Sequence, residues 1–465
     1  MIPNDHFLRA LDDLRHLVSL PSVSARGDNL VECAQVVRDL LDEAGFQTEL
    51  CGGEIGPYVV GETGAGPLTV MIYNHYDVQP EDPIALWQSP PFELTEREGR
   101  WYGRGVADDK GEFISRLAGW RLFRERHPGP LPFRLIWLVD GEEEIGSPSL
   151  EGFLKQRFPG ERVDVCWWEY GEIDSSGRPI ILCGFKGVMA VELRCRTAKA
   201  DLHSSLGAVF DNPLWRLAAA TASLRDETGR VLIDGFYDAV RAPSPAESDL
   251  ASDPPFTFES LVQATGGQRV LQGVDGTNFY QVMNFAPCMN VNGFSGGYAG
   301  EGAKTVLPAS GCVKIDFRLV PDQDPRHVVR LLRAHLDRHG FHDIELIVHD
   351  ANVKPVRSST EHWFIQDARE LLEKYFGQAA IVQPSSPASG TSHPFVEQLG
   401  ANIVGIGLTH HGAMLHSPNE NIIIAQFVAM TECSAALFER LAQRASRRLH
   451  ADARPQENSE IGGTP

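Results

Sequence analysis

LTVMIYNHYD, residues 68–77, is a short apolar run with β-branched residues that ends in two side chains able to serve a metal site. A run of this length and composition predicts a buried strand. A second run, FRLIWLV at 133–139, has the same character, and a helical pattern beginning near Lys110 lies between them. This order of strand, helix and strand predicts an α/β fold with a parallel-rich sheet and helices on both faces.

The pattern changes in the middle of the chain and then returns. Strands are expected at 188–196 and 313–319, helices at 212–225 and 326–339, and a loop-rich region over 240–300. We interpret 188–352 as an inserted α+β lid or dimerisation domain. It interrupts a discontinuous catalytic domain formed by 1–187 and 353–445. The polar residues 446–465 are expected to form a flexible tail.

Composition excludes several classes of protein. The 465 residues include 62 Asp or Glu and 42 Lys or Arg, which gives a formal net charge of −20. Such a chain repels phosphates, so we expect no nucleic-acid partner. We find no signal peptide and no apolar run of the roughly 20 residues that cross a bilayer, so we expect a cytoplasmic protein without a membrane partner. The eight cysteines contain no C-x-x-C pair and are interpreted as buried, reduced thiols.

The end of the first strand carries the first candidate motif. Ligands of parallel sheets bind beyond the carboxyl ends of the strands. His75 offers a nitrogen ligand suited to zinc or manganese. Asp77, two residues later, can accept a hydrogen bond from the imidazole and fix its tautomer. Alone, this pair is more typical of a structural contact.

Two acidic segments supply further candidates. GRGVADDKG at 103–111 resembles a dinucleotide loop, but Asp108 stands where the third glycine would lie and would repel a pyrophosphate. DGEEEIGS at 140–147 follows a strand, and a cation would relieve the repulsion between its three glutamates. One of these carboxylates could bind metal while its neighbour takes a proton from water. A solvated loop is the alternative for both segments.

The remaining candidates are single residues. Glu169 stands among large aromatic residues, with Glu172 as a competitor for the same role. His416 opens HSPNE, and His203 lies in DLHSS within the inserted domain, where a surface turn is the alternative. Two histidines and several acids near strand ends could hold two divalent metals and leave a spare carboxylate as base. Sites of this kind hydrolyse amides and phosphoesters.

Taken in order, these motifs resemble the dinuclear metallopeptidase superfamily of aminoacylases, carboxypeptidase G, desuccinylases and cytosolic dipeptidases. The resemblance runs from about residue 7 to 443 and is nearest to the dipeptidase branch, with cytosolic nonspecific dipeptidase and carnosinase. It implies a homodimer with two divalent metal ions per subunit. Zinc is the first expectation for the metal, and manganese or cobalt are alternatives.

The resemblance also implies roles for the matching residues. The implied metal ligands are His75, Asp108 as the bridging carboxylate, Glu144, Glu169 and His416. Asp77 matches the acid that orients the first histidine, and Glu143 matches the general base, although the run of three glutamates leaves an ambiguity of one position. His203 matches a histidine that crosses a dimer interface to stabilise the partner's oxyanion, and Arg318 matches the arginine that receives the substrate carboxylate. The Asp108-Asp109 peptide is expected to be cis.

The implied reaction is hydrolysis of the amide bond of dipeptides or small peptide-like substrates with a free carboxylate. A hydroxide that bridges the two metals attacks, with Glu143 as general base. An N-acyl-amino-acid deacylase of the deacetylase or desuccinylase type would use the same site and is the first alternative. A non-catalytic dimeric binding protein is the alternative from another class. The sequence does not decide between a dipeptide and an acyl-amino-acid substrate.

Overall fold

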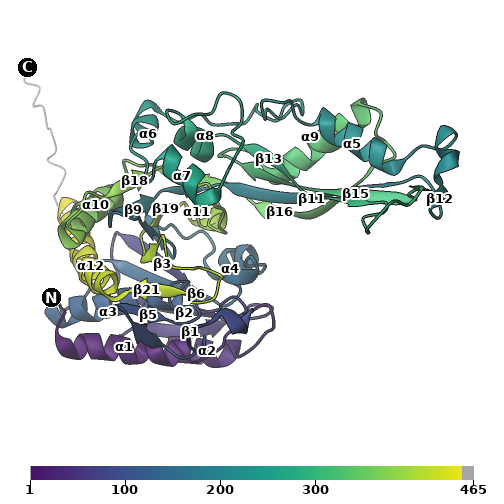
Figure 1. Cartoon of the computed structure of the whole chain (residues 1–465). Coiled ribbons are helices and arrows are strands. Elements are labelled where there is room, and N and C mark those ends of the chain that lie inside the picture. The colour runs from purple at the N-terminus through teal and green to yellow at the C-terminus, as the bar shows by residue number, and fades with distance from the viewer. Residues whose placement is uncertain (1, 453–465) are drawn as a thin grey trace, which may run out of the picture. The chain divides into compact units, whose positions relative to one another are not determined.

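The computed structural model describes residues 2–452, which divide into two compact units (Figure 1). Within the described residues, the first unit comprises 2–181, 361–380 and 397–452. The second comprises Leu182–Thr360 and Ile381–Val396. The inserted segment is thus longer at both ends than the 188–352 expected from the sequence, and residues 381–396 join it.

The first unit is built on a mixed sheet whose centre is parallel. Its strand order is β1 (Gln47–Cys51), β2 (Tyr58–Thr63), β6 (Arg134–Asp140), β3 (Thr69–His75), β7 (Val165–Trp168), β19 (Asn402–Gly405), β9 (Pro179–Leu182), β8 (Glu172–Ile173) and β20 (Thr409–His410). β3 is parallel to both β6 and β7, and β7 is parallel to β19. β1 and β2 extend the sheet in antiparallel fashion. The predicted α/β class with a parallel-rich sheet is confirmed.

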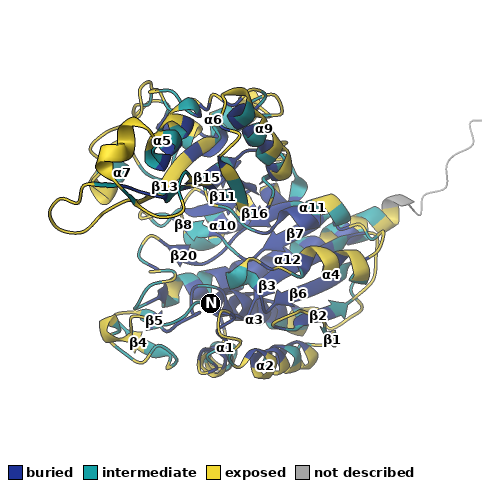
Figure 2. Ribbon diagram, turned by 90° about the vertical axis from the view of Figure 1, so that its right-hand side faces the viewer, coloured by how far each residue is buried: buried dark blue, intermediate teal, exposed yellow. Residues whose placement is uncertain are grey.

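The connections through the central strands place helices on both faces. α3 (Lys110–Arg126) joins β3 to β6, and α4 (Leu150–Arg157) joins β6 to β7 on the other side of β3. Right-handed crossovers in opposite directions put these two helices on opposite faces of the sheet. The central strands are therefore covered on both sides, and Figure 2 shows β3, β6 and β7 as buried.

The other helices of the first unit are α1 (Asn4–Val18), α2 (Leu30–Glu43), α10 (Trp363–Phe376) and α12 (Ile424–Asp452), and α11 (His393–Leu399) crosses the boundary between the units. α12 packs on α3 and α10, and α1 packs on α3. A small sheet of β21 (Asn421–Ile423), β5 (Arg100–Tyr102) and β4 (Thr95–Arg97) completes the unit. α12 continues past residue 446, where the sequence predicts a tail, and 453–465 lie outside the described residues.

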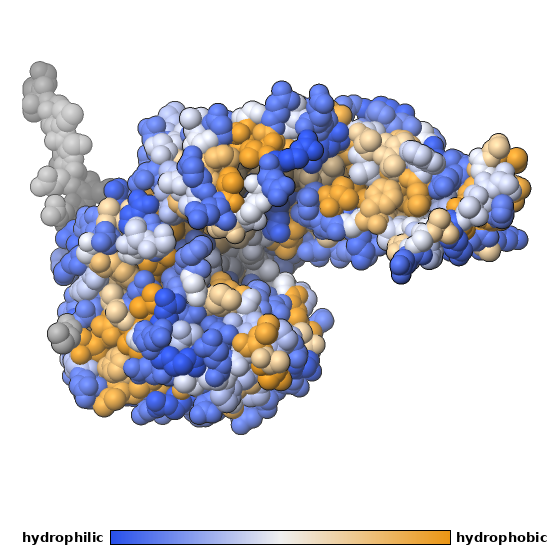
Figure 3. Space-filling view, in the orientation of Figure 1, coloured by the Kyte–Doolittle hydropathy of each residue, from blue (hydrophilic) through white to orange (hydrophobic). Residues whose placement is uncertain are grey.

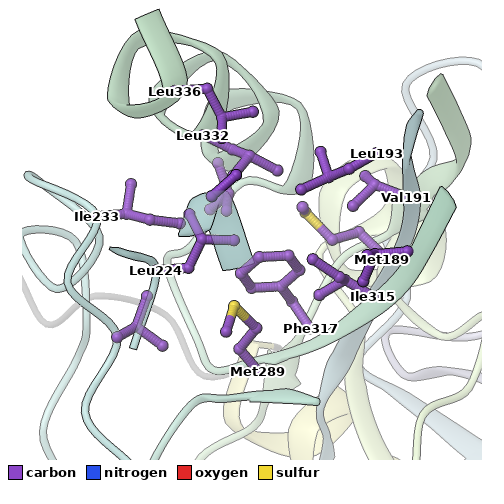
Figure 4. Close-up of a cluster of buried hydrophobic side chains, with 14 of the residues drawn as sticks. Met189, Val191, Leu193, Leu224, Ile233, Met289, Ile315, Phe317, Leu332 and Leu336 are labelled. Carbon is purple, nitrogen blue, oxygen red and sulfur yellow. The ribbon is translucent and has the colours of Figure 1, made fainter. Parts of the chain in front are cut away.

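The second unit contains an antiparallel sheet covered by helices. The strand order is β13 (Cys288–Gly296), β15 (Ser310–Leu319), β11 (Gly187–Arg196) and β16 (Glu345–Val353). Apolar residues that alternate along β15 and β11 form one core with residues of α5 (Pro213–Ser223) and α9 (Pro325–Arg338) (Figure 4). Since side chains alternate across a strand, Arg318 lies on the opposite face from core residue Phe317.

The region 240–300 is rich in loops, as expected, but it also contains short helices and a strand that the sequence did not indicate. The segment contains α6 (Pro245–Leu250), α7 (Phe258–Thr265), α8 (Phe279–Phe285) and β13. Its prolines and glycines suggest irregular structure, but Pro245 occupies the first turn of α6, where proline is tolerated. Ser244 and Glu247 form a capping box, and a small aromatic cluster that includes Phe279 and Phe285 buries the apolar faces.

The structure bears on two expectations, the absence of a membrane-spanning segment and the burial of the cysteines. No helix within residues 2–452 combines the length and the apolar character needed to span a bilayer. The cytoplasmic location stays a prediction. All eight cysteines are free, and five of them are buried, whereas Cys288 is exposed and Cys51 and Cys312 are half-buried.

His362 gives a testable pH dependence of stability. Its side chain accepts the N–H of Phe364 at the start of α10, and burial lowers the pKa of His362 to about 4. In the unfolded chain a histidine titrates near about 6.5. The unfolded chain therefore binds a proton first, and the free energy of unfolding falls as the pH drops from about 6.5 to about 4. We expect His362→Asn, which keeps a capping acceptor, to flatten this dependence in urea titrations. Equal slopes in both proteins would contradict the prediction.

Candidate metal centre and active site

The site begins where strand ends and a helix start coincide in the first unit. His75 is the last residue of β3 and pairs in register with Asp140, the last residue of β6. Asp108 and Asp109 directly precede α3, and the peptide between them is cis, as expected. The sheet edge predicted from the sequence therefore carries the candidate residues.

Asp108 lies between two histidines that are far apart in the sequence. Its Oδ1 is 2.9 Å from Nε2 of His75, and its Oδ2 is 3.1 Å from Nε2 of His416. The same nitrogen of His416 lies 3.2 Å from Oε2 of Glu144. Each oxygen of one carboxylate thus faces a different imidazole, which is the arrangement that a bridging ligand requires.

Two groups of ligand atoms are present among the described residues. One contains His75, Asp109 and Glu169, and the other contains Asp108, Glu144 and His416. Within each group the ligand atoms lie within 4.8 Å of one another. Asp109 was not among the predicted ligands. Its Oδ2 accepts hydrogen bonds from the Asn74 amide at 2.7 Å and the main-chain N–H of His75 at 3.0 Å.

The donor sets fit two divalent cations. Each group combines one imidazole with two carboxylates, a set suited to zinc, manganese or cobalt. Oε2 of Glu169 is buried and has no hydrogen-bond partner within residues 2–452. Burial of an unpaired carboxylate oxygen is costly, and a cation would satisfy it. Glu172 belongs to neither group and accepts the Tyr170 hydroxyl at 2.6 Å, so the geometry favours Glu169 as the ligand.

The structure separates the three consecutive glutamates by their partners. The carboxylate of Glu142 accepts the main-chain N–H groups of Ile55 at 2.7 Å and Ser149 at 3.3 Å, so it is occupied by structural contacts. Glu144 belongs to the second ligand group. Glu143 remains as the acid beside the ligands, which favours the assignment expected from the sequence over the one shifted by a position.

Asp77 contacts His75 with its carboxylate, as expected, and also with its main chain. Nδ1 of His75 lies 3.0 Å from the main-chain oxygen of Asp77 and 3.4 Å from its carboxylate. The carboxylate oxygens of Asp77 accept the N–H groups of Glu143 at 3.2 Å and Glu144 at 3.0 Å. The main chain at Asp77 therefore has the shorter contact with the imidazole, while its side chain holds the glutamate turn in place.

The electrostatics of the site agree with these contacts. Burial raises the pKa of Glu143 well above its usual value; His75 opposes this shift, and the nearby Glu144 carboxylate adds to it. Hydrogen bonds to Asp108 and then Glu144 raise the pKa of His416 to about 10. The raised pKa means that Glu143 holds a proton more readily than a solvent-exposed glutamate does.

Two polar residues outside the predicted motifs support the site, one buried and one half-buried. Arg116, on α3, donates to the main-chain oxygens of Tyr73, Trp168 and Ile406, which joins the ends of three neighbouring strands. Gln79 donates its side-chain amide to Oε2 of Glu144 at 2.9 Å. Sequence reasoning missed both residues because their partners are distant in the chain or are main-chain atoms. The one signal in the sequence was an arginine next to apolar residues in a predicted helix.

Arg318 and His203 lie in the second unit, and their surroundings are described within it. Nη1 of Arg318 donates to Oγ of Ser389 at 2.8 Å, and Nε lies 3.8 Å from Asp316. Much of the guanidinium therefore stays exposed on the polar face of the sheet. His203 is exposed, and its Nδ1 accepts the N–H of Ser205 at 3.2 Å in a local turn.

Comparisons with known proteins cover most of the chain, including these residues. A family model described as Peptidase family M20/M25/M40 matches residues 71–440. The Cys-Gly metallodipeptidase dug1 of Schizosaccharomyces pombe is 28% identical over 89% of this chain and 92% of its own length. Human Beta-Ala-His dipeptidase is 27% identical over 84% of this chain and 78% of its own length.

Solved structures show the same relationship. The M20 family metallo-carboxypeptidase Sso-CP2 from Sulfolobus solfataricus is 34% identical, with a TM-score of 0.86 over 93% of this chain and 99% of that one. The family match includes both groups of ligand residues, from His75 to His416. This chain is a peptidase and belongs to peptidase family M20/M25/M40.

Proposed function

We propose that this protein is a dinuclear metallodipeptidase that hydrolyses the amide bond of dipeptides with a free C-terminal carboxylate. The observation that carries the proposal is the Asp108 carboxylate, which faces His75 with one oxygen and His416 with the other. Two divalent ions, when bound, supply polarisation of the scissile carbonyl and activation of water at neutral pH. Zinc is the first metal to test, followed by manganese and cobalt.

The chain's own groups divide the work around that centre. The five proposed ligands are His75, Asp108, Glu144, Glu169 and His416. Glu143 takes a proton from the attacking water and delivers it to the leaving amine. The raised pKa of Glu143 supports this role, because the residue can then carry the proton between the two steps. The carboxylate of Asp77 accepts the main-chain N–H of Glu143 and so keeps this residue in place.

A panel of substrates tests the proposal directly. Purified protein loaded with zinc or manganese, and a chelated control, would be given free dipeptides, amidated dipeptides, and N-acetyl and N-succinyl amino acids. We expect chelator-sensitive cleavage of free dipeptides in mass spectra. Cleavage of acyl amino acids alone would identify a deacylase with the same site. No cleavage by metal-loaded protein would favour the non-catalytic binding protein.

Arg318 is proposed to bind the substrate carboxylate, because a partly exposed guanidinium reads a carboxylate with two donors. Loss of a charged hydrogen bond costs about 1.5–3 kcal/mol. We therefore expect Arg318→Met to raise KM for free dipeptides by about 10- to 100-fold. Lys314→Met, on the same strand, is the matched control and should leave KM unchanged. If Arg318→Met affects free and amidated dipeptides equally, the assignment is wrong.

A homodimer formed through the second unit is proposed as well. β13 is the edge strand of its sheet, and Phe294 on it and Trp215 on α5 are exposed large apolar residues. Figure 3 shows apolar surface, in orange, in the part of this unit that carries α5. If His203 acts in the partner's site, mixing His203→Ala with Glu143→Ala subunits restores part of the activity. Light scattering that gives a monomer would contradict the proposal.

A further inference from the structure

Glu420 is a completely buried carboxylate that neither the metal ligands nor the proposed base account for. Oε2 accepts Nη1 of Arg104 at 2.7 Å and the N–H of Gly105 at 2.9 Å. Oε1 accepts the N–H groups of Ala107 at 2.8 Å and Asp108 at 3.0 Å. The exposed fraction of Glu420 is 0%. One side chain therefore binds four donors from a single five-residue loop.

This loop is the one that presents Asp108. The N–H of Asp108 is itself one of the four donors, so the main chain at this residue is anchored while its carboxylate remains directed to His75 and His416. Neither oxygen of Asp108 is needed to hold the loop. The loop is thus fixed without use of the carboxylate that the proposed metal centre requires.

Glu420 also belongs to the segment that carries His416. The main-chain oxygen of Glu420 accepts the N–H of Gly103, which joins the two segments a second time. Asn419, its neighbour, accepts the N–H of Gln88 at 2.9 Å and donates to the main-chain oxygen of Leu86 at 2.9 Å. The segment from His416 to Glu420 is therefore fixed to the loop of Asp108 and to residues 86–88.

The contacts of Glu420 offset the cost of burying its carboxylate. Glu420 is a further buried acid near Asp108, and Arg104 is the basic side chain that pairs with it. Buried carboxylates are costly unless all their acceptors are satisfied, and four donors satisfy this one. A charged acceptor also polarises the N–H groups of the loop more strongly than a neutral one would.

We propose that Glu420 is a positioning residue of the metal centre, which fixes Asp108 relative to His416 so that one carboxylate can serve both metal ions. The inference rests on the proposed function, because it assigns Asp108 as the bridging ligand. Residues that hydrogen-bond to metal ligands typically contribute about 10- to 100-fold to metal affinity. Glu420 would act on the main chain of the ligand rather than on its side chain.

Glu420→Gln is the sharpest test, because the amide has the same shape but only one acceptor oxygen. Its NH₂ group would face two N–H donors, whichever way the amide is turned. We expect calorimetric titration of the metal-free protein with Co²⁺ to show an affinity for at least one ion that is weaker by about 10- to 100-fold than in the wild type. The visible absorption of bound Co²⁺ should change, and kcat should fall with little change in KM.

Asp174→Asn is the matched control. Asp174 also accepts two main-chain N–H groups, those of Ser176 and Arg178, and it pairs with the side chain of Arg178. It lies away from the metal ligands, in the turn between β8 and β9. A general loss of stability would lower the Tm of both variants, whereas a positioning role weakens cobalt binding only in Glu420→Gln. Unchanged cobalt affinity in Glu420→Gln would overturn the inference.

Two further outcomes are distinguishable. If Glu420→Gln does not fold, Arg104→Met removes one of the four donors, and cobalt affinity should fall by a smaller factor; unchanged affinity overturns the inference. Wild-type protein that binds two cobalt ions but cleaves nothing in the substrate panel refutes the proposed dipeptidase and leaves the metal-binding test decisive. Wild-type protein that binds no cobalt refutes both.

Discussion

We expect Glu143→Gln to lower kcat by about 10³-fold, within the range that general acid–base catalysis contributes. The amide has the same size as the carboxylate but cannot accept a proton from water or return it to the leaving amine. Glu143 is not a member of either ligand group, so the metal content should be unchanged. KM should also stay within a few-fold, because the proposed carboxylate subsite uses Arg318. Steady-state kinetics together with metal analysis of the same sample checks all three quantities.

Glu142→Gln is the control for this prediction, because it changes the neighbouring residue in the same way. Its carboxylate binds the N–H groups of Ile55 and Ser149, so its loss should cost about 1–3 kcal/mol of stability while kcat stays near the wild-type value. If the large loss of kcat occurs in Glu142→Gln instead, the assignment within the run of three glutamates is wrong by one position. Near wild-type turnover of metal-loaded Glu143→Gln would remove the proposed base altogether.

The sequence predicts the strands and motifs of the first unit well because their signals are local. A buried strand such as 69–75 is a continuous apolar run, and its end marks the edge of the sheet where polar residues gather. The sequence pattern of α3, by contrast, does not indicate how deeply this helix is buried. Lys110 and Arg116 on this helix are buried, and they satisfy their charges with main-chain oxygens from other segments.

The parts of the site that sequence reasoning missed depend on contacts between distant segments. Glu420 and Arg104 are 316 residues apart, and no spacing rule connects them. Nδ1 of His75 contacts both the carboxylate and the main-chain oxygen of Asp77, and only the carboxylate contact was expected from the sequence. A one-letter sequence identifies which side chain is present but not which atom of the residue makes the contact.

The second unit shows the same limit for local structure. Residues 240–300 contain many prolines and glycines, and these favour turns when considered singly. Pro245 instead begins a helix, and the aromatic residues of α7 and α8 pack with one another. Short helices of this kind are stabilised by caps and by packing rather than by propensity, so composition alone underestimates them.

Asp108→Asn has the second large expected effect, because it changes the group between the two histidines. An amide offers one oxygen to a metal and turns its NH₂ toward the other histidine, so it cannot serve two ions at once. We expect metal affinity to fall by more than about 100-fold, beyond the usual effect of an outer partner, and hydrolysis to fall with it. Cobalt titration measures the affinity and stoichiometry without dependence on substrate.

Asp109→Asn is the matched comparison and addresses the membership of Asp109 in the first ligand group. A single oxygen of Asp109 accepts the hydrogen bonds of Asn74 and His75, and the amide oxygen of asparagine can accept both in the same way. The fold around His75 is therefore kept, and the loss of metal affinity should be much smaller than in Asp108→Asn. The reverse ranking would make Asp109 the essential ligand, and the bridging role of Asp108 would then have to be abandoned.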